Sequence, residues 1–204
     1  MGSDGRPFVV GLGGTTRPGS STEWAVRRAL AQAAAYGART ALFAARDLEL
    51  PLYAPERQER TAAALALVDA LRRADGIIIG SPGYHGGVSG MVKNALDYVE
   101  DLRNDERPYF DGRAVGCIVC ANGWQGTTTT LVALRSIVHA LRGWLTPLGV
   151  AINSGDRVFA ADGEVTDTDV ARKLDLVGLQ VAEFAWQRSR AAHPVAQGSS
   201  SLDL

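Results

Sequence analysis

The sequence has few cysteines, no excess of basic residues and no long apolar run. Its 21 lysines and arginines face 22 aspartates and glutamates, so the formal net charge at pH 7 is −1. Because nucleic acid is bound mainly by cationic side chains that neutralise phosphates, this balance argues against a nucleic-acid partner. No apolar stretch approaches the roughly 18 to 20 residues that cross a bilayer, so no membrane partner is expected either.

The two cysteines, Cys117 and Cys120, lie in an apolar segment that is typical of a strand, where residues three apart face opposite sides. This placement predicts two core thiols; the alternative, a redox pair, is expected at the start of a helix. A chain of this length can bury a core without disulfides or a structural metal. With so few cysteines and no secretory leader pattern in residues 1–7, we expect a cytoplasmic protein without a metal centre.

Short apolar segments alternate along the chain with segments of helical period. Strands are expected at residues 7–11, 39–43, 76–80, 114–121 and 150–153. Apolar residues spaced at i, i+3, i+4 and i+7 predict a helix after each strand; the fourth is expected to contain residues 134–148 and the last residues 170–184.

This alternation predicts an α/β fold, namely a doubly wound, five-stranded parallel sheet with helices on both faces. A single domain is expected over residues 1–190, followed by a mobile tail at residues 191–204, whose apolar content is too low to pack. Ligands of such sheets bind outside the carboxyl ends of the strands. We therefore expect the loops after the first, third and fourth strands to form the site.

The loop after the first strand is rich in hydroxyl groups and contains one guanidinium. Hydroxyls, an arginine and the free N–H groups of a helix start are the parts of a phosphate site. Other phosphate loops fit less well, because Ser20 stands where the P-loop needs lysine and Thr16 where GxGxxG needs its third glycine. The alternative is that these residues only form the turn and cap the helix, with Ser20 and Glu23 as a capping box. The candidate phosphate-binding residues are Thr15, Arg17, Ser20, Ser21 and Thr22.

The loop at residues 81–87 places Tyr84 and His85 among residues with little side-chain bulk. Such a loop suits a flat ligand, for example a flavin ring, although a turn with a packed tyrosine gives the same pattern. The loop at residues 122–126 combines glycines with the amides of Asn122 and Gln125 and with an indole that either contacts a ligand or covers the core.

Together these segments resemble the NAD(P)H-dependent FMN reductases of the flavodoxin-like superfamily, which include related quinone and azo-dye reductases. Residues 14–17 and 20–22 are similar to the GSxRxxS loop of that family, and residues 48–53 to its LxxPLY segment. Residues 81–97, SPGYHGGVSGMVKNALD, are the most specific match and resemble SPxYxxxxxGxLKNALD. The chain departs from the family with Thr15 for serine, Gly83 where glutamate is frequent and His85 where asparagine is common.

The resemblance implies bound FMN, with its phosphate on the first loop and its ring between the other two. The implied ring contacts are Pro82, Gly83, Tyr84, His85, Gly86 and Gly87 on one side, and Asn122, Gly123, Trp124, Gln125 and Gly126 on the other.

The implied reaction is hydride transfer from NADPH or NADH to FMN, after which the reduced flavin or its electrons reach a second acceptor, such as a partner monooxygenase. His85 is a candidate for donating a proton to a reduced quinone or orienting a nicotinamide; the alternative is a solvated loop histidine. Two alternatives remain open: an FMN-dependent quinone or azo-dye reductase, and a flavodoxin-type electron shuttle that passes electrons between protein partners without NAD(P)H activity. The near-neutral charge argues against the shuttle, because that family is strongly acidic.

The family commonly pairs subunits across the helices that follow the third and fourth strands. A homodimer or homotetramer is therefore expected, with Val88, Met91, Tyr98 and Trp144 as candidate contacts. The alternative is that these residues pack within one subunit.

Overall fold

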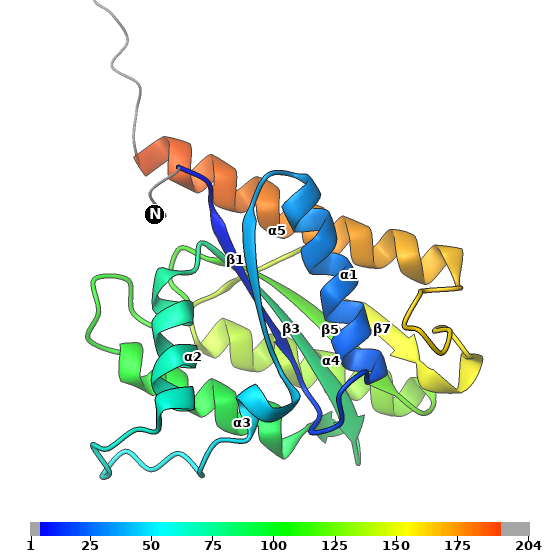
Figure 1. Ribbon diagram of the computed structural model, residues 1–204, viewed down its shortest axis with the longest axis horizontal. Coiled ribbons are helices and arrows are strands. Elements are labelled where there is room, and N and C mark those ends of the chain that lie inside the picture. Colours follow the sequence, from blue (N-terminus) through cyan, green and yellow to red (C-terminus); the bar gives the residue numbers. More distant parts are fainter. Residues whose placement is uncertain (1–4, 193–204) are drawn as a thin grey trace, which may run out of the picture.

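A twisted sheet runs through the middle of the molecule and carries helices on both faces (Figure 1). The computed structural model describes residues 5–192. Strands β1 (Phe8–Gly13), β2 (Arg39–Ala44), β3 (Gly76–Tyr84) and β5 (Ala114–Ala121) are parallel and lie side by side in the order β2-β1-β3-β5. Beside β5 lie β6 (Trp144–Leu145) and β7 (Val150–Asn153). The predicted parallel, doubly wound α/β architecture is confirmed.

The predicted number of strands is wrong, because the sheet has seven. Both additional strands are short: β4 (Gly87–Val88) returns antiparallel along β3, and β6 is a separate two-residue strand. Since β6 and β7 pair with successive parts of β5, they share one position at the edge of the sheet. Five strand positions therefore carry the fold, as the alternating pattern predicted.

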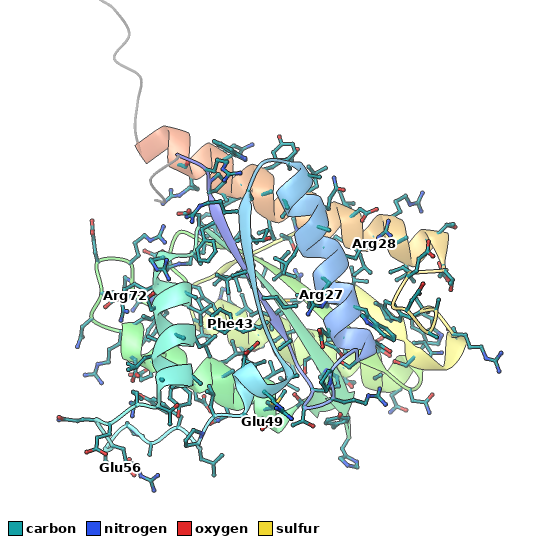
Figure 2. All side chains as sticks on the ribbon, viewed as in Figure 1. Arg27, Arg28, Phe43, Glu49, Glu56 and Arg72 are labelled. Atoms are coloured by element: carbon teal, nitrogen blue, oxygen red, sulfur yellow. The ribbon has the colours of Figure 1, made fainter. Side chains whose placement is uncertain are left out.

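Two helices cover one face of the sheet and three cover the other. Helices α1 (Ser21–Ala35) and α5 (Thr168–Ala192) pack on the first face and on each other. Arg28 of α1 pairs with Asp175 of α5 at 2.7 Å, and Figure 2 shows Arg28 on the side of α1 that faces α5. Helices α2 (Ala62–Arg73), α3 (Gly90–Asp97) and α4 (Trp124–Ala140) cover the second face. Short 3-10 helices, η1 (Ala45–Leu48), η2 (Tyr98–Leu102) and η3 (Ser154–Asp156), complete the order of elements.

The fourth helix is shorter than predicted. The apolar spacing that continues through residues 145 and 148 is coincidental, because α4 ends at Ala140 and Arg142 takes a left-handed φ of 64°. Leu145 belongs to β6, and Pro147 prevents a helix from continuing. Conversely, α5 extends to Ala192, so residues 191 and 192 are helical instead of belonging to the predicted tail. The rest of that tail, residues 193–204 with His193, lies outside the described residues.

The two cysteines face opposite sides of the sheet, as predicted from their spacing. Cys117 packs in the core beneath α2, α3 and α4, and Cys120 in the core beneath α1 and α5; both are buried and free. Burial raises the pKa of each thiol to about 12. These thiols are structural. Within residues 5–192, no helix is both long enough and apolar enough to span a membrane.

One buried cation escaped the sequence analysis. Arg113, next to β5, is 1% exposed and donates to the carbonyl oxygens of Arg72 and Ala74 at 2.8 and 2.9 Å and of Tyr109 at 2.9 Å. Burial lowers the pKa of this guanidinium to about 10. Arg113 thus joins the end of α2 to the turn before β5, at the amino ends of the strands and away from the predicted site. Nothing in the sequence distinguishes it from a surface arginine.

Candidate functional site

The loops after β1, β3 and β5 meet at the carboxyl edge of the sheet, as predicted (Figure 1). A Cβ built on Gly14 would lie 2.8 Å from the carbonyl oxygen of Gly80 and 3.2 Å from Cδ of Pro82, so the first loop touches the end of β3. A Cβ on Gly83 would lie 2.8 Å from Cβ of Ala121, at the end of β5.

The first loop ends in a capped helix. Oγ of Ser20 accepts the N–H of Glu23 at 3.2 Å, which confirms Ser20 as the N-cap of α1. The reciprocal bond differs from the predicted capping box, because the Glu23 carboxylate accepts the N–H of Gly19 at 3.0 Å in place of the N–H of Ser20. Arg27 balances this carboxylate, with Nε donating to it at 2.8 Å. The capping bond uses only a lone pair of the Ser20 oxygen, so its hydroxyl hydrogen remains available for a ligand.

The remaining candidates of the first loop differ in what they offer. Arg17 is exposed, and no ion pair joins it to a carboxylate among the described residues. The Thr15 hydroxyl donates to the carbonyl of Arg17 at 3.0 Å. Ser21 is partly exposed in the first turn, where the N–H groups of a helix have no intrahelical acceptor. Thr22 is buried with its methyl group facing Gly80, so its contribution to the loop is its backbone N–H in the first turn of α1.

The segment predicted as the second loop is a β-hairpin. Gly83 pairs with Val88 and Tyr84 with Gly87. The two residues between them, His85 and Gly86, have φ of 52° and 78°, the sign of a type I′ turn at both positions. Asn-Gly is the preferred pair in such a turn, and histidine is among the residues that tolerate positive φ, so His85 can replace the asparagine common in the family.

The hairpin presents its tip to solvent and its base to α4. Tyr84 is 57% exposed, whereas Pro82 is buried. At the base, a Cβ on Gly83 would also lie 2.9 Å from the Thr130 Oγ1, a buried oxygen without a hydrogen-bond partner. Because Ala121 and Thr130 fill this space, the glutamate that is frequent in the family does not fit here without movement of β5 or α4.

The third predicted loop is mostly the start of a helix. Only Asn122 and Gly123, with φ of 95°, precede α4, and the segment from Trp124 to Gly126 forms its first turn. Trp124 is 59% exposed, which excludes the alternative that it covers the core.

Asn153, at the end of β7, is a positioning residue that the sequence analysis missed. Its Oδ1 accepts the N–H of Gly123 at 2.8 Å, and its Nδ2 donates to Asp156 at 3.1 Å. The available signal was a polar residue that ends a strand at the same edge of the sheet.

The LxxPLY and KNALD segments, noted for their resemblance to the family, contact each other. Nδ2 of Asn94, on α3, donates to the carbonyl of Pro51 at 2.9 Å, and its Oδ1 accepts the N–H of Tyr53 at 2.8 Å. The hydroxyl of Tyr98 donates to the same Pro51 carbonyl at 3.0 Å. Helix α3 therefore holds the chain after η1 against the second face of the sheet.

The candidate subunit contacts do not form one surface. Tyr98 is buried in the core, so the alternative of packing within the subunit holds for it. Val88 and Met91 are half-buried beside the hairpin, whereas Trp144 lies on β6 against Phe184 of α5, with ring centroids 5.8 Å apart.

The residues at this edge fit the parts of FMN. An unpaired guanidinium, several hydroxyls and free N–H groups suit a phosphate monoester. Tyr84, on the hairpin, and Trp124, at the start of α4, are exposed aromatic side chains at the same edge of the sheet, and such side chains suit contact with a flat ring. The Glu23 carboxylate lies near the phosphate position, but Arg27 neutralises it.

Known proteins resemble this chain in sequence and in fold. The family model described as NADPH-dependent FMN reductase matches residues 7–156. The FMN-dependent NADPH-azoreductase of Staphylococcus aureus (strain USA300) is 33% identical over 113 residues, which are 54% of this chain and 56% of the azoreductase. The match thus spans little more than half the length of that curated relative.

Solved structures show the same fold at low sequence identity. FerB, a flavoenzyme NAD(P)H:(acceptor) oxidoreductase from Paracoccus denitrificans, superposes with a TM-score of 0.70 at 21% identity, covering 90% of this chain and 98% of FerB. A flavodoxin, WrbA-like protein from Agrobacterium tumefaciens superposes with a TM-score of 0.59 at 20% identity, covering 90% of this chain and 98% of its own. These similarities identify the flavodoxin-like fold.

Proposed function

The chain belongs to the NADPH-dependent FMN reductase family, and from this premise we propose that it is an oxidoreductase that transfers a hydride from NAD(P)H to FMN. The observation that carries the proposal is the meeting of three loops at one sheet edge: a hydroxyl- and arginine-bearing loop beside a hairpin with an exposed tyrosine and a helix start with an exposed tryptophan. In an open parallel sheet, ligands bind at this edge.

The first loop holds the phosphate of FMN in this proposal. Arg17 and the hydroxyls of Ser20 and Ser21 donate to phosphate oxygens, together with the first N–H groups of α1. Thr15 joins them when its hydroxyl turns away from the Arg17 carbonyl, whereas Thr22 contributes its backbone N–H. A phosphate monoester carries nearly two negative charges, so the helix dipole and the guanidinium both favour it.

The hairpin and the start of α4 hold the ring. Residues 82–87 line one side and residues 122–126 the other, with Tyr84 and Trp124 supplying aromatic contact and Asn122 and Gln125 supplying amides. FMN supplies the redox chemistry, because its ring accepts a hydride from the reduced nicotinamide and gives two electrons to a second acceptor. His85, at the exposed tip of the hairpin, is placed to orient a substrate or donate a proton to it.

One version of the proposal has an azo dye or a quinone as the second acceptor, and the similarity to the azoreductase favours this version. Transfer of reduced flavin to a monooxygenase is the other version. Tyr84 and His85 are exposed, so the hairpin is accessible either to a second acceptor or for the release of reduced flavin. We further propose that subunits associate around Val88 and Met91 as a homodimer or homotetramer, which sedimentation analysis tests directly.

The decisive experiment is anaerobic oxidation of NADPH and NADH by the purified protein under three conditions: without added flavin, with catalytic FMN plus a quinone or azo dye, and with stoichiometric FMN alone. Oxidation that saturates with stoichiometric FMN identifies a flavin reductase. Oxidation sustained by the dye or quinone with catalytic FMN identifies the dye or quinone reductase. Absence of oxidation under all three conditions rejects the proposal and leaves the electron shuttle.

A further inference from the structure

A cavity of about 590 Å³ lies between the segment 51–61 and Tyr98, the residue that follows α3. Its lining includes Leu52, Arg57, Gln58, Glu59, Arg60 and Tyr98. The volume falls within the range of small-molecule sites, and the mixture of apolar wall and polar groups is typical of them. The segment follows β2 and η1, so the cavity opens at the carboxyl edge of the sheet. None of its lining residues belongs to the proposed FMN contacts.

The walls of this cavity are held in place by hydrogen bonds. Arg60 makes two bonds to Asp101, Nε to Oδ2 at 2.7 Å and Nη2 to Oδ1 at 2.8 Å, and its guanidinium stacks over the Tyr53 and Tyr98 rings. Another nitrogen of Arg60 donates to the carbonyl of Arg57. A ligand therefore meets a wall that is already ordered, which lowers the entropic cost of binding.

The two arginines in the cavity lining differ in whether an acidic side chain already neutralises them. Arg60 is neutralised by Asp101, whereas Arg57 is exposed and no ion pair joins it to an acid within residues 5–192. Glu59 is the one carboxylate in the lining, and Figure 2 shows Glu56 at the outer end of the segment. Arg57 is thus the cation that remains free to bind an anionic group.

The distance between the hairpin and the cavity indicates how long a ligand that contacts both must be. Ser89 follows the hairpin and caps α3, and Tyr98 follows the last residue of α3. Eight helical residues rise about 12 Å, so Tyr98, in the cavity wall, lies about that far along α3 from the end of the hairpin. A dinucleotide whose nicotinamide contacts the flavin carries its adenosine at the far end of a pyrophosphate and two riboses. An adenosine half of this kind reaches away from the ring by a comparable distance.

We propose that the cavity between the segment 51–61 and Tyr98 binds the adenosine end of the electron donor, and that Arg57 binds its 2′-phosphate and so selects NADPH over NADH. Leu52 and the neighbouring Pro51 contact a purine face, and Gln58 bonds to its polar edge. A guanidinium contributes charge-assisted bonds to a phosphate and nothing comparable to a ribose hydroxyl. This inference rests on the proposed reductase function.

The test uses the FMN-loaded protein and titration calorimetry with 2′,5′-ADP, 5′-AMP and inorganic phosphate. We expect 2′,5′-ADP to bind about tenfold more tightly than 5′-AMP, and Arg57→Ala to remove this difference. Arg172→Ala is the matched control, because it removes the same charge from α5, on the opposite face of the sheet, and leaves the difference unchanged. Equal binding of all three ligands, or loss of binding in Arg17→Ala but not in Arg57→Ala, overturns the inference.

Steady-state kinetics separates this inference from the proposed function. Arg57→Ala is expected to raise KM for NADPH about tenfold while KM for NADH and kcat stay within twofold of the wild type. If NADPH is oxidised and its KM is unchanged in Arg57→Ala, the inference fails and the reductase function stands. If neither nucleotide is oxidised, the reductase function fails, and calorimetry alone decides whether the cavity binds the phosphoadenosine.

Discussion

The side-chain Oδ1 of Asn94 accepts the backbone N–H of Tyr53 at 2.8 Å, across 41 positions of sequence. The amide group of Asn94 also donates to the carbonyls of Leu50 and Pro51, at 3.3 and 2.9 Å. One side chain therefore satisfies three backbone groups of a segment that has no regular secondary structure of its own. The LxxPLY segment therefore depends on the KNALD segment, because Asn94 of the second supplies hydrogen-bond partners to backbone groups of the first.

Replacing Asn94 is expected to loosen the segment 49–54. Asn94→Ala leaves partly buried backbone groups without partners, which costs about 1–3 kcal/mol in the free energy of unfolding. Urea denaturation measures this cost, and amide hydrogen exchange is expected to rise at Tyr53. Lys93→Ala is the control, because its ion pair with Asp97 is exposed and contributes little. Unchanged exchange at Tyr53 in Asn94→Ala would contradict the role given to this amide.

The hairpin turn provides a test that separates backbone conformation from chemistry. His85 has a φ of 52° and its side chain is exposed, so the turn constrains its backbone more than its imidazole. His85→Asn is expected to keep or raise stability, because Asn-Gly is the preferred pair of a type I′ turn. His85→Val is expected to lower the free energy of unfolding by about 1–2 kcal/mol, since a branched residue resists positive φ.

Kinetics with the same two variants tests the candidate role of His85 in proton transfer. If the imidazole donates a proton to the substrate, His85→Asn lowers kcat although it folds as well as the wild type. If it does not, His85→Asn keeps kcat and its pH profile, and only the less stable His85→Val loses activity. The proton-donor interpretation is rejected by wild-type kcat in His85→Asn with a quinone acceptor.

Much of the fold follows from short-range patterns. The strands at residues 114–121 and 150–153 were predicted with their observed bounds, because each is a short apolar run bounded by turn residues. The opposite orientation of Cys117 and Cys120 required only the two-residue period of a strand. The ends of α4 and of β3 were not predicted correctly. In both places, apolar spacing or glycine content suggested one element, whereas a positive φ at Arg142 or at His85 produced another.

The site was predictable as a set of loops but not in its details. The loops followed from the rule that ligands bind at the carboxyl ends of parallel strands. The hydrogen bond from Gly123 to Asn153, the burial of Thr22 and the bonds from Arg113 to the carbonyls of Arg72 and Ala74 depend on long-range packing. No local pattern in a single sequence encodes such contacts.

Arg17 is expected to distinguish FMN from riboflavin. Riboflavin lacks the phosphate, so Arg17→Ala should weaken FMN binding about tenfold and leave riboflavin binding unchanged. Fluorescence quenching of each flavin on titration with protein measures both dissociation constants. FMN binding by the wild type should also weaken with added salt, because the contact is between exposed charges.

Arg172→Ala serves as the control for Arg17→Ala, since Arg172 is an exposed arginine of α5. Parallel weakening of FMN and riboflavin in Arg17→Ala would show that the loop has changed shape instead of losing one phosphate contact. Unchanged FMN binding would remove Arg17 from the proposed phosphate site.

The buried thiols of Cys117 and Cys120 should lower the free energy of unfolding at alkaline pH. Burial raises the pKa of Cys117 and of Cys120 from 9.0 to about 12, so both thiols stay protonated in the folded protein after they ionise in the unfolded chain. Above pH 9 the unfolded state therefore binds fewer protons than the folded state. Consequently, the free energy of unfolding decreases as pH rises, by up to about 1.4 kcal/mol per pH unit for each thiol. Below pH 8 the thiols contribute no pH dependence.

Urea denaturation between pH 8 and 10.5 measures this fall, and the double variant Cys117→Ala, Cys120→Ala identifies the part due to the thiols. The variant is less stable at every pH because it loses buried volume, but its stability should decline less steeply above pH 9. The native thiols should also resist a thiol-specific reagent that labels both in urea, since the thiolate is the reactive form. If the folded protein is labelled rapidly at pH 7.5, at least one thiol is accessible. If, in addition, the free energy of unfolding falls equally steeply with pH in the wild type and the variant, the redox interpretation of the CxxC segment must be reopened.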